Sequence, residues 1–568
     1  MLKLTRAAAS IVAIVCFTIS LAHAQTPANE HNCPSVTAIP PDVGSGTTVF
    51  SPNQNLCLPR LAPTPTGLSP LAFIVQGVEP GDRVDAQGSV YVVSIRGVPG
   101  GVDLWRWHPA QDGGPNKNKT LPFRYEGQPD NCGIFSFTGG GCANNTGNAT
   151  NLGLAPGGGD VDIALNFPDP LNSNIPNIAL TSLTLAPGVT ATNSKNRGDS
   201  FFTPPNLAAT LIPGDDREWQ DAIDASTVYL SYHDAATFNI DVQRSNDGGR
   251  TYLAGTGEAI DAQTLPAAAT PSGTANTAGQ IRIDHSKCSS RGNLYQIFVA
   301  PDSAAENVNG APQRSVYVGV SQDAKLGLPA FTFTDHKIFT SPAGSLGAKN
   351  GTDQIFPALA ADDFGFLYAV WSDNSNIFFS SSSDLGTTWR TLPIRVNQGT
   401  TVGKANVFPW VAADANGHVV VVWFGANLAG NSNDRAAMEK TCSTGTNSCW
   451  AKWNVYMVES VNGNSSTPKF TQYTASDHII HSGTVSTGGL GGGANRNLAD
   501  YFQVALDLQH RANISFADDH LASPTCTTQS PGHCANDDPQ AFRVGTPYFT
   551  YQLKTNPGIV TAGRCAAH

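Results

Sequence analysis

One pattern recurs along the sequence and limits what this chain can fold into. Its clearest copies are Phe356–Asp373, FPALAADDFGFLYAVWSD, and Phe408–Gly425, FPWVAADANGHVVVVWFG. Each copy joins an alternating apolar run, a tight turn with Gly or Asn, and a second run of β-branched and aromatic residues, which is typical of a two-stranded hairpin. A chain that repeats such a unit buries its hydrophobic surface by packing successive units together.

Weaker copies bring the number of units to seven. Five further segments share the pattern, and they begin at Asp82, Gly159, Trp219, Ile281 and Phe502. The second strands of the units are expected to begin near residues 90, 177, 228, 294, 367, 418 and 513. These spacings exceed the roughly 40 to 50 residues of a four-stranded propeller blade, so the excess is expected in loops. We therefore predict an all-β fold, a β-propeller with seven four-stranded antiparallel blades, or six if one copy is false.

Composition agrees with a turn-rich β protein. The chain has 568 residues, with 56 glycines, 38 prolines and only 14% charged residues. It is too long for one ordinary core, so the choice lies between several domains and a repetitive architecture. We expect a single propeller domain at 71–568, preceded by an extended arm at 25–70. The formal net charge of −11 argues against nucleic acid as a partner, because nucleic-acid binding needs a basic surface.

The first 24 residues have the pattern of a cleaved signal peptide. Lys3 and Arg6 precede an apolar run, which ends at the small-residue site around Ala24. The run is too short to span a bilayer comfortably, and no later segment approaches 18 consecutive apolar residues. We therefore predict a secreted protein without a membrane span, located outside the cell or in the periplasm.

Cysteine usage is typical of an oxidising compartment. Of the 11 cysteines, Cys16 leaves with the leader, and the even number that remains suits a set of disulfides. The simplest bridges join near neighbours: Cys132 with Cys142, Cys442 with Cys449, and Cys526 with Cys534. The pairing of four others stays open: Cys33, Cys57, Cys288 and Cys565.

Two short segments share a second motif. Ser245–Tyr252, SNDGGRTY, and Ser382–Trp389, SSDLGTTW, both fit S-x-D-x-G-x-T followed by an aromatic residue. Degenerate forms are SKNRGDSF from Ser194, SQD from Ser321 and QDGG from Gln111. Because Asp can bond nearby backbone N–H groups and Gly can adopt a left-handed conformation, the motif suits a turn between third and fourth strands. We assign it to the frame of the fold and not to the functional site.

These two segments resemble the Asp box of the sialidase-type propellers, which are built from BNR repeats. The similarity covers most of residues 80–555. It implies a propeller that is a glycoside hydrolase, or a relative that binds without catalysis. A sialidase holds the substrate carboxylate with three arginines and uses a tyrosine nucleophile and an aspartate acid/base. This sequence offers Arg83 and Arg217 at first-strand starts and Tyr501 beside Asp500, but no third equivalent arginine.

Ionisable residues gather at the predicted starts of first strands and ends of second strands, which meet on one face of a propeller. Such groups around one funnel suit a polar ligand, although capping of strand ends and mutual pairing remain an alternative. We assign catalytic roles to Asp216, Glu218, Asp500 and Tyr501. Substrate binding is assigned to six residues: Arg83, Arg217, Asp82, Asp160, His233 and Asp353.

The segment Asp215–Trp219, DDREW, carries the sharpest expectation. Successive residues of an extended strand point to opposite sides, so Arg217 and its flanking acids share a side only if the chain bends. We predict a turn there, at least one carboxylate beside Arg217, and Trp219 packed between blades.

The leading functional prediction is a secreted carbohydrate-active propeller, a sialidase-like glycoside hydrolase acting on a glycan in the central funnel. The alternative is a non-catalytic propeller that binds a glycan or a protein. Two carboxylates within about 5 to 9.5 Å across an open cleft would favour catalysis. The sequence lacks HExxH and zinc-spaced cysteines, so we predict no metal or cofactor, although Asp160 and Asp162 are compatible with a structural calcium ion.

Overall fold

The computed structural model of the chain describes these residues: 49–56, 77–97, 101–108, 123–130, 157–165, 176–184, 188–202, 206–209, 215–234, 236–269, 276–307, 313–342, 354–399, 403–440, 449–488, 493–520 and 545–567. The predicted signal peptide lies outside them, as do Asp353, Gln111 and seven further cysteines: Cys33, Cys57, Cys132, Cys142, Cys442, Cys526 and Cys534.

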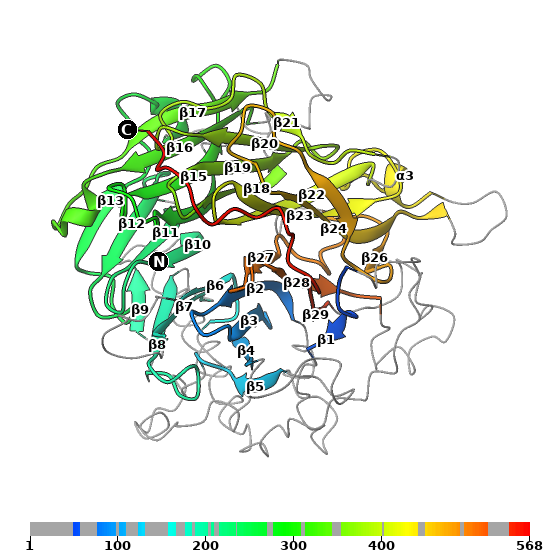
Figure 1. Ribbon diagram of the computed structural model, residues 1–568, viewed down its shortest axis with the longest axis horizontal. Helices are drawn as coiled ribbons and strands as arrows, with labels where there is room; N and C mark the ends of the chain where they lie inside the picture. Colours follow the sequence, from blue (N-terminus) through cyan, green and yellow to red (C-terminus); the bar gives the residue numbers. More distant parts are fainter. Residues whose placement is uncertain are drawn as a thin grey trace, which may run out of the picture.

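Seven antiparallel sheets are arranged as blades around one axis (Figure 1). The strands of each blade are given from the inner strand outward. Blade 1 is β2 (Val78–Val84), β3 (Val90–Ile95), β4 (Val102–Trp107) and β5 (Arg124–Gly127), and blade 2 is β6 (Val161–Leu165), β7 (Ile178–Leu183), β8 (Val189–Ser194) and β9 (Asn206–Ala209). Blade 3 is β10 (Asp215–Ala222), β11 (Val228–Asp234), β12 (Ile240–Ser245) and β13 (Gly255–Glu258). Blades 4 and 5 are β14 (Thr277–Ile283), β15 (Leu294–Ala300), β16 (Ser315–Ser321) and β17 (Thr334–Thr340); and β18 (Gln354–Ala361), β19 (Leu367–Ser372), β20 (Ile377–Ser382) and β21 (Ile394–Arg395). Blade 6 is β22 (Ala405–Asp414), β23 (His418–Ala426), β24 (Lys452–Ser460) and β25 (Thr471–Thr474), with the short β26 (His481–Ser482) also on β24. The seven-bladed propeller with four-stranded antiparallel blades is thus confirmed, and it is the fold that the resemblance to sialidase-type propellers implies.

Blade 7 closes the ring with both ends of the chain. Its strands are β27 (Gln503–Leu506), β28 (Ala512–Asp518), β29 (Thr546–Tyr551) and, outermost, β1 (Gln54–Asn55). Since β1 belongs to the segment predicted as an extended arm, this part of the arm is an outer strand of the propeller. The predicted starts of second strands agree with the structure to within one residue: 90, 178, 228, 294, 367, 418 and 512.

Helix is scarce in the described part of the chain. It contains α3 (Arg435–Met438) and two 3-10 turns, Pro266–Ala268 and Ala324–Leu326. None of these is an apolar helix that could cross a membrane.

Five of the seven inner strands share a break in register. The ladder shifts within β2, β10, β14, β18 and β22, in each case near the beginning of the strand. Glu79, Arg217 and Phe408 sit at such breaks with φ values of 51°, 63° and 55°. A bulge of this kind turns a side chain away from its expected face. We call the face on which the inner strands begin the start face.

Aromatic side chains fill the axis beneath the start face. Trp219 lies 5.5, 5.3 and 4.8 Å, ring centre to ring centre, from Phe356, Trp410 and Tyr501. All four are buried, and they come from four different blades. Trp219 thus packs against residues from three other blades, at the axis of the propeller.

The serine–aspartate motif forms turns between third and fourth strands, as expected. In blade 3, Ser245 Oγ accepts the amide of Gly249 at 2.9 Å, and Asp247 accepts the amides of Arg250 and Thr251 at 3.1 and 2.9 Å. Blade 5 repeats this geometry at Ser382 and Asp384. Gly249 and Gly386 have φ values of 90° and 87°, which favour glycine.

Related turns occur in three more blades. They pair Ser194 with Asn196, Ser321 with Asp323, and Ser460 with Asn462. The first two were expected from the degenerate motifs, whereas the third was not, because asparagine replaces the aspartate and no Gly-x-Thr follows it.

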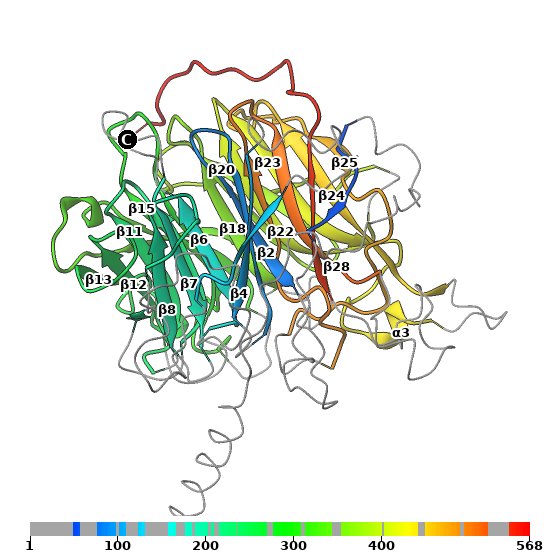
Figure 2. The ribbon, with the colours of Figure 1, turned by 90° about the horizontal axis from the view of Figure 1, so that it is seen from below.

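The C-terminal segment crosses the face opposite the start face, which we call the tail face (Figure 2). The amide of Asn416 donates to the carbonyl of Val560, and the amide of Ala566 donates to the carbonyl of Phe364. A disulfide between Cys288 and Cys565 anchors its end to the turn after β14. This bridge settles one pairing that the sequence left open.

Candidate functional site

Arg217 is the centre of a polar group on the start face. Its Nη1 lies 2.9 Å from Asp500 Oδ2 and 3.9 Å from Asp160 Oδ2, and its Nε lies 3.5 Å from Asp216 Oδ2. Its guanidinium stacks over the ring of Phe356 at 4.7 Å. The register break between Asp216 and Trp219 produces the predicted bend, and carboxylates flank Arg217 as expected.

Within this group, Asp160 has a carboxyl whose pKa lies close to neutral pH. Its side chain is 16% exposed. Burial raises its pKa to about 6; the charges of Asp216 and Asp500 add to the rise, and Arg217 opposes it. Asp160 can therefore give or take a proton near neutral pH.

Glu79 lies beneath Asp160 and is buried. Its Oε1 accepts the amide of Asp500 at 3.0 Å. Burial, together with the charges of Asp160 and Asp500, raises its pKa well above the usual range. These effects favour the protonated form of Glu79, which can donate a hydrogen bond to a neighbouring carboxylate.

Asp500 is held by two arginines. Its oxygens accept from Arg496 Nη1 and Nη2 at 2.8 and 2.9 Å, in addition to the contact with Arg217. Its side chain is 2% exposed. We call Glu79, Asp160, Asp216, Arg217, Arg496 and Asp500 the polar ring.

Two other predicted catalytic residues lie below the polar ring. Glu218 is buried, and burial with the charges of Asp160 and Asp216 raises its pKa well above the usual range. Tyr501 belongs to the aromatic group of the axis, and its hydroxyl donates to the carbonyl of Val161 at 2.7 Å. The bulge in β10 accounts for the position of Glu218, because it places Arg217 toward solvent and the next residue beneath it.

Asp82 and Arg83 lie near the other end of the axis. The weak repeat from Asp82 suggested a first strand beginning there, but β2 begins at Val78 and these residues are near its end. Arg83 Nη2 lies 2.8 Å from Asp162 Oδ1, and Arg83 also donates to Gln503. Asp82 is buried, and burial raises its pKa well above the usual range. The structure therefore does not bring these two residues to the polar ring.

His233 borders the polar ring, although it lies near the end of the second strand β11 and not after it as expected. It pairs in register with Asp216, and burial lowers its pKa, with Asp216 and Asp234 opposing this. Asp162 faces Arg83 while Asp160 faces Arg217, so the two aspartates that suggested calcium have different partners.

Sequence reasoning missed Glu79 and Arg496. A usable signal for Glu79 was the proline that follows it, because Pro357 and Pro409 occupy the corresponding breaks in β18 and β22. Proline within a sheet is confined to edges and bulges. Arg496 lies in a loop without periodicity, and its only signal is the spacing of four residues to Asp500.

No family model and no curated protein matches the sequence. Similar solved structures include a protein of unknown function from Dyadobacter fermentans, with 11% identity, a TM-score of 0.36, and 68% of this chain and 93% of that chain covered. A second is the GH93 α-L-arabinofuranosidase of Fusarium graminearum with arabinobiose, with 12% identity, a TM-score of 0.34, and 61% of this chain and 88% of that chain covered. A third is a leech intramolecular trans-sialidase with 2,7-anhydro-Neu5Ac, with 8% identity, a TM-score of 0.35, and 84% of this chain and 68% of that chain covered. Likeness at this level concerns the fold alone and assigns no activity to this chain.

Proposed function

We propose that this protein is a secreted glycoside hydrolase that acts on a neutral glycan at the polar ring. The observation that carries the proposal is Asp160, a partly exposed carboxyl whose pKa is about 6, next to an arginine that holds further carboxylates. Glycoside hydrolysis needs one carboxylic acid to protonate the leaving oxygen and one carboxylate to attack or to activate water.

Asp160 takes the role of general acid. A pKa near 6 leaves a fraction of the group protonated at neutral pH while keeping it acidic enough to transfer the proton. Glu79 beneath it is a positioning residue, because its protonated carboxyl supports the ionised form of Asp160 after transfer.

Asp216 takes the role of the second carboxylate. Its side chain is 53% exposed and it flanks the same guanidinium as Asp160. Carboxyl pairs in glycosidases are about 5 to 9.5 Å apart. Two carboxylates on one guanidinium suit such a separation, and Arg217 Nε pairs with Asp216 at 3.5 Å.

The charge of the polar ring favours a neutral substrate. Arg217 and Arg496 are both paired with carboxylates, and Arg83 lies near the other end of the axis. Among the described residues, a substrate carboxylate such as that of sialic acid would face several acidic groups at the polar ring and no free arginine fork. The proposed specificity thus differs from that of a sialidase, although the Asp-box resemblance motivates the choice of a glycan.

Export is part of the proposal. The predicted leader at 1–24 and the Cys288–Cys565 disulfide both suit an oxidising compartment.

The second candidate is a non-catalytic propeller that binds a glycan or a protein at the same face. It is favoured by the mutual pairing of Arg217, Arg496 and Asp500, which resembles a brace between blades. Hydrolysis of neutral chromogenic glycosides, set beside binding on a glycan array, distinguishes the two. Turnover that is lost in Asp160→Asn supports the hydrolase, whereas glycan or protein binding without turnover supports the second candidate.

A further inference from the structure

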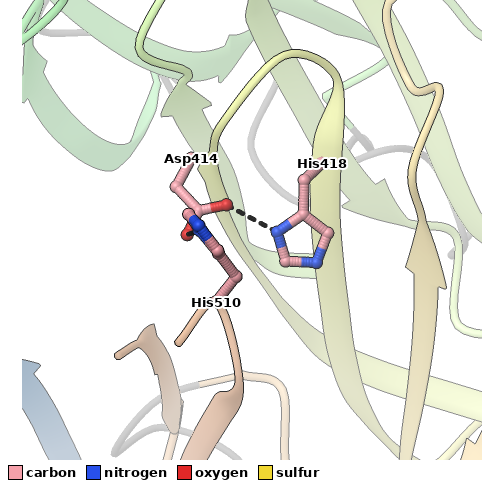
Figure 3. Close-up of side chains that lie close together, drawn as sticks. All are labelled: Asp414, His418 and His510. Carbon is pink, nitrogen blue, oxygen red and sulfur yellow. Dashed lines mark hydrogen bonds and ion pairs between the residues drawn. The ribbon is translucent and has the colours of Figure 1, made fainter. Parts of the chain in front are cut away.

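Two clusters in the described part of the chain combine two histidines with one aspartate. Asp414, His418 and His510 lie on the tail face (Figure 3), whereas the second cluster, His478, Asp518 and His520, lies on the start face. In each cluster the candidate ligand atoms lie within 4.8 Å of one another. The two clusters differ in how their ring nitrogens are used.

The tail-face cluster is explained by ion pairs. Asp414 accepts from His418 Nδ1 at 2.5 Å and from His510 Nδ1 at 2.8 Å, and His418 Nε2 faces Glu459 at 3.2 Å. Burial lowers the pKa of His418, but its hydrogen bonds to Asp414 and Glu459 outweigh this and raise it to about 9. The ring centres of His418 and His510 are 6.3 Å apart, whereas those of His478 and His520 are 4.2 Å apart.

The start-face cluster brings two ring nitrogens together. His478 Nε2 lies 3.1 Å from His520 Nδ1, and both nitrogens lie 2.5 Å from oxygens of Asp518. All three residues are buried. If both nitrogens carried protons for Asp518, two N–H groups would crowd one another, and His520 Nε2 would still have no hydrogen-bond partner among the described residues.

A neighbouring carboxylate orients His478 as a ligand. Asp477 Oδ1 lies 2.7 Å from His478 Nδ1, and Asp477 Oδ2 accepts the amide of Asn53 at 2.9 Å. Metal-binding histidines commonly donate the N–H of their other ring nitrogen to a carboxylate, which fixes the orientation of the ring.

We propose that His478 Nε2, His520 Nδ1 and Asp518 bind one divalent transition-metal ion, Zn²⁺ before others. Zinc–nitrogen bonds are about 2.0 to 2.1 Å long, so ligands of a tetrahedral ion lie about 3.3 Å apart, close to the observed separation of the two nitrogens. Two imidazoles with one carboxylate also match the donor types that zinc prefers. The Asp518 contacts lengthen when the ion enters.

The proposed ion links the parts that close the propeller. His478 follows β25 of blade 6, while Asp518 is the last residue of β28 in blade 7 and His520 follows it. Through Asp477 and Asn53 the site also reaches the residue that precedes β1. The ion therefore has a structural role, fastening blade 6 to the blade that both chain ends share.

The test measures zinc in the intact, disulfide-oxidised protein. The chain is treated with a chelator, dialysed, and titrated with Zn²⁺ by calorimetry, with bound metal counted by mass spectrometry. His520→Ala is the main variant because its side chain, 11% exposed, lies at the edge of the cluster. His510→Ala in the tail-face cluster is the matched control.

The expected result is one zinc per chain for the wild type and for His510→Ala, at least a tenfold weaker affinity for His520→Ala, and a zinc-dependent rise of Tm in the first two only. Absence of a zinc equivalent in the wild type, or its loss in His510→Ala with retention in His520→Ala, overturns the proposal. If His520→Ala does not fold, the absorption spectrum of wild-type protein loaded with Co²⁺ decides: a spectrum without histidine-nitrogen coordination contradicts the site.

Discussion

Replacing Asp247 by alanine tests whether the serine–aspartate turns belong to the frame. The carboxylate accepts four hydrogen bonds, from the amides of Arg250 and Thr251 and from the hydroxyls of Ser245 and Thr251. A net hydrogen bond contributes about 0.5 to 1.5 kcal/mol, and water replaces part of the loss at this exposed turn. We therefore expect Asp247→Ala to lower the free energy of unfolding by about 1 to 3 kcal/mol without changing turnover per folded molecule.

The assay is equilibrium urea unfolding, followed by tryptophan fluorescence at several pH values. Burial raises the pKa of Asp247 slightly, but hydrogen bonds from Thr251 and Ser245 outweigh this and lower it. A lowered pKa stabilises the fold above the unfolded value of about 3.9, and the gain is lost as pH falls through the folded value. The difference between wild type and Asp247→Ala should therefore shrink below about pH 4. Leu253→Ser, at an 88% exposed neighbour, is the control; lost turnover with unchanged unfolding would refute the frame assignment.

Three further predictions address other contacts. Arg217→Lys keeps the charge but loses the two-pronged contact with Asp216 and Asp500. We therefore expect at least a tenfold fall in kcat/KM, about 1.4 kcal/mol, together with a lower Tm. Full turnover per folded molecule would show that Arg217 has only a structural role between blades. His418→Gln should lower the free energy of unfolding most below about pH 6.5, and the loss should vanish as pH rises through about 9. The reason is that His418, whose pKa is raised, stabilises the fold only while its ring is protonated. A urea midpoint difference that does not depend on pH would contradict this. Cys565→Ser should speed protease cleavage within 553–567 while the blades stay intact, and an unchanged cleavage rate would show that backbone contacts alone hold the segment.

The blades could be predicted from the sequence because their signal is local and repeated. Alternation in segments such as Phe408–Gly425 fixes which residues pair, and seven copies support one another. The turns at Ser245 and Ser382 could be placed for the same reason. The outer strand β1 could not, because two residues far from any repeat carry no periodic signal.

The site could be predicted only in part. Asp160, Asp216, Arg217 and Asp500 meet as expected, because each lies at or just before the beginning of an inner strand. Bulges limited the rest, since a register break near the start of a strand decides which neighbour points to solvent and which is buried.

The same limit applies to residues that the repeat could not align. Glu218 is buried because it follows the break in β10. Arg83 was assigned to the wrong end of its strand because the weak first repeat hid where β2 begins.

The most direct test of the proposed function is the pH dependence of glycoside hydrolysis by wild type and Asp160→Asn. General acid catalysis contributes about 10² to 10⁴ in rate, so the variant should lose at least 100-fold in kcat. Wild-type activity should fall as pH rises through about 6, where Asp160 loses its proton. Asp199→Asn, at a 49% exposed surface carboxylate, is the control and should retain activity. Turnover that survives in Asp160→Asn with the same pH profile, or no hydrolysis of any neutral glycoside by the folded wild type, would contradict the proposal.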